Sequence, residues 1–454
     1  MKDKGRETAI VIGAGMAGLC TAQVLSEHFR KVIVVERDKL TNSSEHRKGV
    51  PQSHHVHVLQ TAGRFALDKL FPDVDKHIAS LGVEPLDWCR DMKMYHVGGW
   101  RHHGNSSDLL VRPVSRPLLE WVVRRELLKK NQVEFYDGMK VIGLLLSEDR
   151  KSVVGVRLKQ ECGTISEINA KITIAASGGN SSVMGWFKDI ELPIPDEEVV
   201  SHDAYYSSRI YKAPKADNFP WRTMYVFPSP PKSFTGGAIL PIEGGQWHVT
   251  LAGYDSHVPP INDEGFEGFA MQLPGEGEFG RALAAAEPIS AIRRYKLPPN
   301  RWRHFEKMDI LPDGFIAIGN TLCEFNPSYG QGMTVAAQSA LVLKEVLCQN
   351  GFENNLPRSF YKKVTPYLKV PWASATISDK RFSTTNELKL SRFETILSNY
   401  MDMLFDAAVY DRELWRRALA VLHMVEPPLT LIKPSSILKV ASYKAFGFRN
   451  REHD

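Results

Sequence analysis

The sequence lacks the features that mark secreted, metal-binding, membrane-spanning or nucleic-acid-binding proteins. Five of its 454 residues are cysteine, and they lie far apart without a CxxC pair, which argues against a disulfide framework or a zinc site. No apolar run approaches the roughly 18 residues of a spanning helix, and the first apolar run contains a glycine motif rather than a signal peptide. The 57 basic and 52 acidic residues leave a net charge of +5 with no basic block that would indicate nucleic acid. We therefore expect a cytoplasmic protein without metal and with more than one structural unit.

A glycine motif follows the first apolar run, Thr8–Ile12, whose β-branched residues fit a buried parallel strand. The glycines of the motif are Gly13, Gly15 and Gly18. Such glycines permit a tight turn, a close approach of the backbone to a pyrophosphate and close packing of helix on strand. A second buried strand, predicted at residues 31–35, ends at Glu36, whose carboxylate can accept hydrogen bonds from ribose hydroxyls. The motif thus predicts a bound FAD or NAD rather than NADP.

A second glycine-rich segment follows a short apolar strand predicted at residues 315–318. It reads PSYGQG from Pro327 to Gly332 and precedes a helical pattern from Met333 to Leu347. The N-terminus of this predicted helix can face an anion or the edge of an electron-rich ring. Two such sites, far apart in the chain, fit one extended cofactor that is held at its adenosine end by the first and near its flavin by the second. The pair therefore favours FAD over NAD.

With these motifs the chain resembles the flavin-dependent monooxygenases of the para-hydroxybenzoate hydroxylase and squalene epoxidase superfamily, and within it the bacterial epoxidases of the polyether-antibiotic type. The resemblance spans residues 8–345 and rests on the segments GAGMAG with VVERD, RKGVPQSHHVHVL, SRPLLEWVVRREL, ITIAASGGNSSV, GGAILPIEGGQWHVTLAG and LPDGFIAIGN with FNPSYGQGM. It implies an α/β (overall α+β) fold in which a Rossmann-like FAD-binding domain is combined with an antiparallel sheet that forms the substrate cavity. The implied electron donor is NAD(P)H, acting directly or through a separate flavin reductase.

The resemblance also implies roles for individual residues. The loop with Gln52, His55 and His57 would lie beside the flavin ring, Arg116 near the ribityl or phosphate region, and the backbone of Val141 at the adenine. The implied cofactor-binding residues are Gly13, Gly15, Gly18, Glu36, Arg37, Gln52, Arg116, Val141, Asn320, Pro327, Gly330, Gly332 and Met333. The candidate proton donors or relays are His55, His57 and Tyr329. A surface position for Arg116 is the alternative, and the two histidines have no HExxH or carboxylate partner that would indicate a metal.

Two motifs depart from the family pattern. The GD carboxylate that usually holds the ribityl chain is replaced by Gly319-Asn320, and an asparagine keeps an acceptor oxygen but loses the charge. The middle DG motif of the aromatic hydroxylases is replaced by ASGG, Ala176 to Gly179. Similar ASG forms occur in the epoxidase branch, so this change favours an epoxidase and leaves the direct electron donor open.

The pattern of residue types changes between about residues 200 and 300. Apolar or aromatic residues alternate there with polar ones, and paired glycines indicate turns. This pattern predicts an antiparallel sheet with one face free to cover a ligand. Its candidate substrate-binding residues are Tyr206, Tyr225, Phe227 and Trp247, with a core position as the alternative for each. The predicted division is an FAD-binding domain at 1–195 (with a short substrate-domain insertion near 85–112), a substrate domain at 196–300, a return to the FAD-binding domain at 301–350, and a C-terminal helical region at 351–454.

The C-terminal region shows apolar residues at helical spacing, beginning at Phe393. Its tail, Lys433 to Arg451, mixes cations with apolar residues. Such a segment can contact an anionic membrane surface, and a docked surface helix is the alternative interpretation.

The predicted activity is that of an FAD-dependent monooxygenase. Neither a Ser-His-Asp nor a paired-carboxylate motif is recognisable, which fits an enzyme whose cofactor supplies the chemistry. In the resembling enzymes the reduced flavin forms a C4a-hydroperoxide with O2, and an alkene can attack its distal oxygen without a protein base. We expect epoxidation of an apolar terpenoid or polyketide-like secondary metabolite. The alternatives are an aromatic (phenol or indole) hydroxylase, an alkene reductase resembling geranylgeranyl reductases, and a carrier without flavin. The WxWxIP motif of flavin halogenases is absent.

Overall fold

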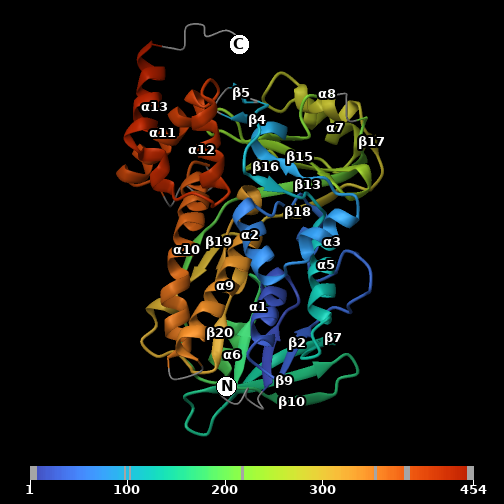
Figure 1. The fold of residues 1–454 in the computed structure, drawn as a ribbon, viewed down its shortest axis with the longest axis vertical. Helices are drawn as coiled ribbons and strands as arrows, with labels where there is room; N and C mark the ends of the chain where they lie inside the picture. Colours follow the sequence, from blue (N-terminus) through green and yellow to red (C-terminus); the bar gives the residue numbers. More distant parts are fainter. Residues whose placement is uncertain are drawn as a thin grey trace.

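The computed structural model describes residues 8–96, 99–101, 104–215, 219–351, 355–382 and 389–446. A parallel sheet forms the centre of its lower half (Figure 1). The strands, in spatial order, are β20 (Phe315–Ala317), β11 (Ile172–Ala175), β1 (Thr8–Ile12), β2 (Lys31–Glu36) and β7 (Val133–Asp137). Both strands predicted around the first glycine motif are present. Their central residues, 9–12 and 32–35, are all apolar and buried because this sheet is covered on both faces.

Helices cover one face of the parallel sheet and a small antiparallel sheet covers the other. The helices are α1 (Met16–Ser26), α5 (Arg116–Leu128) and α9 (Gly332–Asn350), with α10 (Leu356–Asp379) packed on α9. The small sheet consists of β8 (Met139–Leu146), β9 (Val153–Gln160) and β10 (Ile165–Asn169). The helix predicted after the second glycine segment is α9, which begins one residue earlier than expected and extends three residues further.

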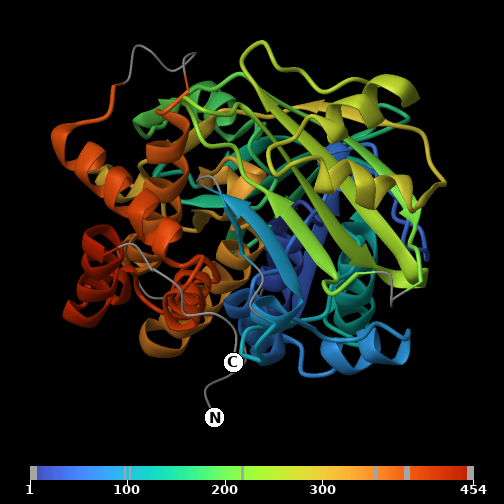
Figure 2. The ribbon, with the colours of Figure 1, turned by 90° about the horizontal axis from the view of Figure 1, so that it is seen from above.

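An eight-stranded sheet forms the second layer of the molecule. Its strands are β17 (Glu287–Pro288), β13 (Ala204–Lys212), β16 (Gln246–Tyr254), β15 (Thr235–Ile242), β14 (Thr223–Val226), β4 (Met92–His96) and β5 (Gly99–Arg101), with β18 (Arg293–Lys296) paired to β13. All pairs are antiparallel except β14 with β4. The helices α7 (Asp263–Met271) and α8 (Glu278–Ala284) cover its outer face (Figure 2).

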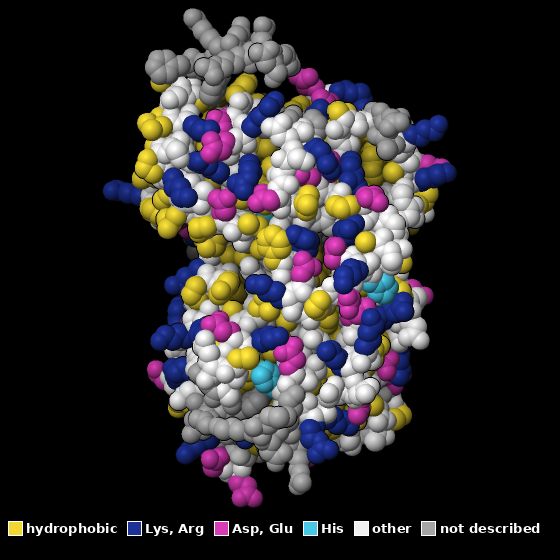
Figure 3. Space-filling model, in the orientation of Figure 1, with side chains coloured by type: hydrophobic (Ala, Val, Ile, Leu, Met, Phe, Trp, Pro, Cys, Tyr) yellow, Lys and Arg dark blue, Asp and Glu magenta, His cyan; other side chains and the backbone are white. Residues whose placement is uncertain are grey.

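Shorter elements connect these layers. They are η1 (Pro51–His54), α2 (Thr61–Leu70), α3 (Val74–Ser80), β3 (Leu86–Asp87), α4 (Trp88–Asp91), β6 (Leu110–Val111), α6 (Val183–Asp189), β12 (Glu197–Val200), η3 (Glu243–Gly245), β19 (Asn300–Arg303), η4 (Phe305–Lys307), η5 (Gly319–Thr321), β21 (Cys323–Glu324) and η6 (Pro327–Tyr329). The space-filling view shows acidic and basic side chains interspersed over the visible face (Figure 3).

The C-terminal helices lie beside the large sheet (red in Figure 1). They are α11 (Arg392–Ala407), α12 (Arg412–Leu422) and α13 (Pro434–Phe446), with η8 (Pro428–Ile432) between the last two. The helix α11 begins with a capping box formed by Ser391 and Glu394. Buried Leu404 and Trp415 share one hydrophobic cluster with Met92 of β4. The C-terminal helices are therefore part of the body of the protein rather than an appendage.

Membrane contact by the C-terminal tail stays a prediction. The helix α13 exposes Ile437 and Leu438, but its Lys439 is held by Asp411 and Glu413 at 2.8 Å each. The rest of the tail, residues 447–451, lies outside the described residues. Within the described ranges, we find no helix with the length and hydropathy needed to cross a bilayer.

Candidate cofactor and substrate site

A cavity of about 520 Å³ lies between the parallel sheet and the large sheet. Its nucleotide end is formed by the ends of β1 and β2 and by the start of α1, and its far end by β4, β14, β15 and the end of α12. Eighteen of the expected residues line it: Gly13, Gly15, Glu36, Arg37, Gln52, His55, His57, Arg116, Val141, Tyr206, Tyr225, Phe227, Asn320, Pro327, Tyr329, Gly330, Gly332 and Met333. The fold thus brings residues from both glycine segments to one cavity.

The three glycines of the first motif have different surroundings. Gly13 has φ +105°, and a Cβ there would lie 2.6 Å from the carbonyl oxygen of Ala176. A Cβ on Gly18 would lie 1.8 Å from the carbonyl oxygen of Gly13, and Gly18 does not border the cavity. A Cβ on Gly15 would have no neighbour closer than 3.9 Å. The first and third glycines therefore permit the turn and its packing, whereas Gly15 leaves open space at the N-terminus of α1.

A buried chain of alternating charges crosses the nucleotide end of the cavity. Arg47 lies 3.0 Å from Glu36 and 2.7 Å from Glu120, and Arg116 lies 2.6 Å from Glu120. Although burial opposes it, the charges of Arg116 and Arg47 hold the pKa of Glu120 below its usual value. Glu36 also accepts a hydrogen bond of 2.8 Å from the backbone amide of Ala14. The predicted surface alternative for Arg116 is wrong, because its side chain is only 12% exposed.

These groups fit the adenosine and pyrophosphate portion of FAD. The open space at Gly15 faces backbone amides at the N-terminus of an 11-residue helix, which is a favourable place for a diphosphate. Arg47 and Arg116 add positive charge beside it, and Glu36 provides acceptor oxygens for ribose. Sequence reasoning missed Arg47 and Glu120; the i,i+4 spacing of Glu120 from Arg116 is the one signal that pointed to the latter.

The second glycine segment forms the wall where the flavin would lie. Gly330 follows η6 with φ +65°, and α9 begins two residues later. Asn320 donates a hydrogen bond of 3.3 Å to Glu324, which also lines the cavity. Burial raises the pKa of Glu324 to about 6. A carboxyl group is therefore present beside the position where the GD motif has lost one, although it comes from a residue that the motif does not include.

A buried network of hydrogen bonds holds η6 in place. Asp379, at the end of α10, accepts hydrogen bonds from Asn300 at 2.6 Å and Asn326 at 2.8 Å. The side-chain oxygen of Asn326 caps η6 by accepting from the amide of Ser328 at 3.0 Å, and the hydroxyl of Ser328 lies 2.7 Å from that of Tyr206. The C-terminal region thus positions the flavin-side loop, a contribution that no sequence motif indicated.

Comparison with known proteins agrees with this geometry. Residues 6–349 match the family described as FAD binding domain. The chain belongs to this family. Protein Rv3254 of Mycobacterium tuberculosis (strain ATCC 25618 / H37Rv) is 28% identical to it over 419 residues, which cover 89% of this chain and 87% of that protein. Squalene monooxygenase of Mus musculus is 27% identical to it over 186 residues, which cover 37% of this chain and 28% of that enzyme. The solved structure of the flavin-dependent brominase Bmp2 superimposes with a TM-score of 0.65 at 14% identity, covering 92% of this chain and 93% of that one.

The chain therefore has the fold of flavin-dependent enzymes. Its cofactor is FAD. NAD(P)H is the electron donor typical of such enzymes. A separate flavin reductase and the closer likeness to polyether-type epoxidases stay predictions.

The candidate proton donors at the site are neutral groups. The His55 Nδ1 lies 2.6 Å from the hydroxyl of Ser208, and the His57 Nδ1 lies 2.9 Å from the carbonyl oxygen of His55. Burial and the neighbouring His57 lower the pKa of His55 to about 3, and burial and Arg116 lower that of His57 to about 3. Burial raises the pKa of Tyr329, so its hydroxyl keeps its proton. These side chains are therefore neutral near neutral pH, and their role as proton donors or relays stays a prediction.

We expect the pH dependence of kcat/KM to contain no ionisation of these histidines between about pH 5 and pH 9. Both side chains are neutral throughout this range, because their pKa values lie at about 3. An inflection near pH 6 would belong to Glu324 and should disappear in Glu324→Gln but persist in His57→Asn. Steady-state rates of the three proteins test this, and an inflection that His57→Asn alone removes would contradict it.

One predicted substrate residue lies on the wrong face of the large sheet. Trp247 is 6% exposed and packs in the cluster beneath α7 and α8, with its ring centroid 5.7 Å from that of Trp221. It does not border the cavity. Successive residues of a strand face opposite sides, and the hydrophobic pattern could not separate the two faces because both are covered, one by helices and one by the cavity wall.

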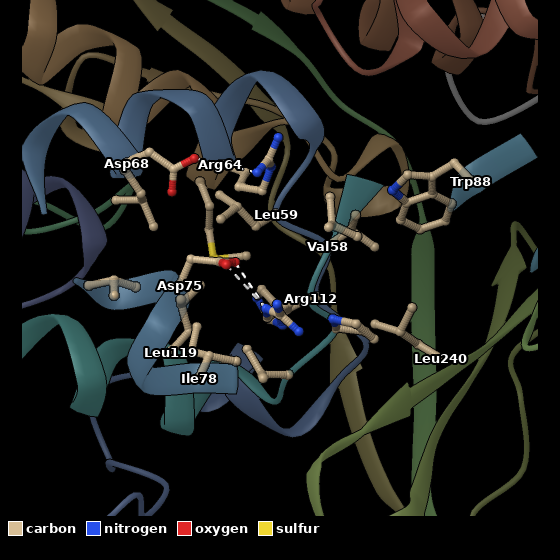
Figure 4. A pocket seen from close by; sticks show the side chains of 17 residues that line it. Val58, Leu59, Arg64, Asp68, Asp75, Ile78, Trp88, Arg112, Leu119 and Leu240 are labelled. Carbon is tan, nitrogen blue, oxygen red and sulfur yellow. Dashed lines mark hydrogen bonds and ion pairs between the residues drawn. The ribbon is translucent and has the colours of Figure 1, made fainter. Parts of the chain in front are cut away.

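A smaller cavity of about 30 Å³ adjoins the large one (Figure 4). Trp88, Val58, His57 and Met333 border both cavities. On its other side Arg112 Nε lies 3.2 Å from the carboxylate of Asp75, the pair joined by dashed lines in Figure 4. This space is large enough for a single water molecule or one oxygen-sized group.

Proposed function

We propose that the protein is an FAD-dependent monooxygenase that epoxidises an alkene of an apolar terpenoid or polyketide-like secondary metabolite with one oxygen atom from O2. The observation that supports this most directly is the composition of the far end of the cavity. Its lining comes from α4, β4, β14, β15 and the end of α12, and consists of Trp88, Met92, Met94, Tyr225, Val226, Phe227, Pro228, Gly237, Ala238, Leu422 and His423. Among these described residues there is no carboxylate and no cation. An apolar, uncharged substrate matches such a lining.

The absence of a base at this end distinguishes the two main candidate reactions. An alkene supplies its own electron pair to an electrophilic oxygen, so its epoxidation needs positioning and exclusion of water rather than proton abstraction. A phenol is activated by loss of its proton, which requires a base close to the substrate. His423, at this end, has its pKa lowered to about 3 by burial and is hydrogen-bonded to Thr61 at 3.3 Å. The geometry therefore favours the alkene.

The remaining residues would hold the cofactor and order the site. Glu36, Arg47 and Arg116, with the amides at Gly15, would bind the adenosine and pyrophosphate portion. The η6 loop and the start of α9 would face the flavin. When bound and reduced by NAD(P)H, FAD would activate O2, one atom of which enters the substrate. The His55 and His57 side chains would form hydrogen bonds near the flavin, with neutral His57 presenting its Nε2 as an acceptor because its Nδ1–H donates to the carbonyl oxygen of His55. The large sheet would exclude bulk water.

The test is incubation of the FAD-loaded protein with NADPH, labelled dioxygen, and a panel of polyenes and phenols. We expect one labelled oxygen atom in an epoxide and none in a phenol. A second arm with an added flavin reductase reports whether NADPH reduces the flavin directly. An anaerobic control separates an alkene reductase, which would turn over without O2. Labelled hydroxylation of phenols, together with faster flavin reduction when a phenol is bound, would instead establish the aromatic hydroxylase.

A further inference from the structure

Two buried polar atoms at the far end of the cavity have no hydrogen-bond partner among the described residues. They are the indole Nε1 of Trp88 and the hydroxyl oxygen of Tyr225. Trp88 is 2% exposed, and its ring centroid lies 6.0 Å from that of Tyr225 and 4.7 Å from that of His423. Both side chains line the large cavity, and Trp88 also lines the small one, where Figure 4 shows its nitrogen turned to the side of Val58.

A buried polar atom without a partner destabilises the folded protein, and a functional site is a common reason for its presence. Core packing alone would not require a polar atom at either position. The ring that stacks on Tyr225 offers it no partner, because Phe227, with its centroid 6.0 Å away, has no polar group. The two atoms therefore stand where a ligand could provide the missing partner.

The chemistry of the two groups limits what that partner is. An indole N–H only donates, and burial raises the pKa of Tyr225, so its hydroxyl keeps its proton. Both groups therefore suit an acceptor oxygen. The lysine and arginine residues that line the cavity, Arg37, Arg47, Lys48, Arg116 and Lys140, belong to the nucleotide-end segments. A carboxylate or phosphate at the far end would thus be buried without a counter-charge.

We propose that Trp88 and Tyr225 determine substrate specificity by donating hydrogen bonds to a neutral acceptor oxygen, a carbonyl or hydroxyl, on an otherwise apolar substrate. The acceptor lies where the two cavities meet, and the hydrocarbon part extends along Met92, Met94 and Phe227. This inference rests on the proposed function, since it describes the substrate of the same site.

The experiment measures binding without turnover. The oxidised, FAD-loaded, full-length protein is titrated with farnesene, farnesol, farnesal and farnesoic acid, which share one skeleton, and binding is followed by the change in flavin absorbance. We expect farnesol and farnesal to bind about 10-fold more tightly than farnesene or farnesoic acid, as one or two hydrogen bonds would produce. In Tyr225→Phe and Trp88→Phe this preference should fall to about threefold or less, with farnesene unchanged.

The control Phe227→Leu removes packing but no donor and should weaken all four probes alike. The proposal is overturned if farnesene or farnesoic acid binds as tightly as the alcohol, if neither oxygen-bearing neutral probe binds, or if both phenylalanine variants keep the wild-type preference. Because no reaction takes place, the result is separate from the labelled-oxygen assay. Selective binding without epoxide formation would refute the proposed function and leave this inference standing.

Discussion

Gly15→Trp is expected to give a folded protein that no longer retains FAD. The Cβ position of Gly15 has no neighbour closer than 3.9 Å, so the indole would extend into the open space at the start of α1 and would not disturb the core. Loss of two charge-assisted hydrogen bonds to the pyrophosphate, each contributing about 1.5–3 kcal/mol, would weaken FAD binding at least about 100-fold. The flavin absorbance of the purified protein and its thermal unfolding report the two properties separately.

Two variants make this prediction specific. Gly268→Trp places the same side chain on α7, where a Cβ would meet nothing within 4 Å, and should retain both the fold and FAD. Gly18→Ala should lower the unfolding temperature instead, because its Cβ would lie 1.8 Å from the backbone oxygen of Gly13. Full flavin content in Gly15→Trp would show that the cofactor does not approach this helix, and the proposed function would lose its basis.

Asp379→Leu is expected to reduce the free energy of unfolding by roughly 2–6 kcal/mol, because it leaves the amide groups of Asn300 and Asn326 without this acceptor, at about 1–3 kcal/mol each. Asp379 is fully buried, and Asn326 caps η6, beside which the flavin would lie. FAD binding should therefore weaken together with stability. Denaturant unfolding and flavin titration measure the two effects, and Asp379→Asn, which keeps the shape and one acceptor oxygen, should lose less of both.

The same carboxyl group predicts how stability changes with pH. Burial raises the pKa of Asp379 in the folded protein to about 7, from 3.8, so the folded state holds its proton more tightly than the unfolded state. The protonated Asp379 carboxyl group therefore contributes its full share of the folding stability below about pH 4, and this share is lost as the pH rises to about 7. Asp379→Asn should lack this segment of the pH profile. Equal slopes for the two proteins between these pH values would contradict the assignment.

The sequence by itself determined the features that depend on neighbours along the chain. The strands β1 and β2, the turn at Gly13, the acid at Glu36 and the helix after PSYGQG were all predictable, because alternation, buried apolar runs and glycine conformations are local properties. The FAD cofactor followed from the presence of two such segments. These parts of the site are encoded in short stretches that fold in the same way wherever they occur.

The tertiary structure alone decided which distant residues meet at the site. It placed Trp247 in the core beneath α7, Glu324 beside Asn320, and Arg47 between Glu36 and Glu120. It also brought Asp379 and His423 from the C-terminal helices to the network behind η6 and to the far end of the cavity. Such contacts arise from packing between elements that are far apart in the chain, and the residues that make them are chosen by shape and burial, which leave no local pattern to recognise.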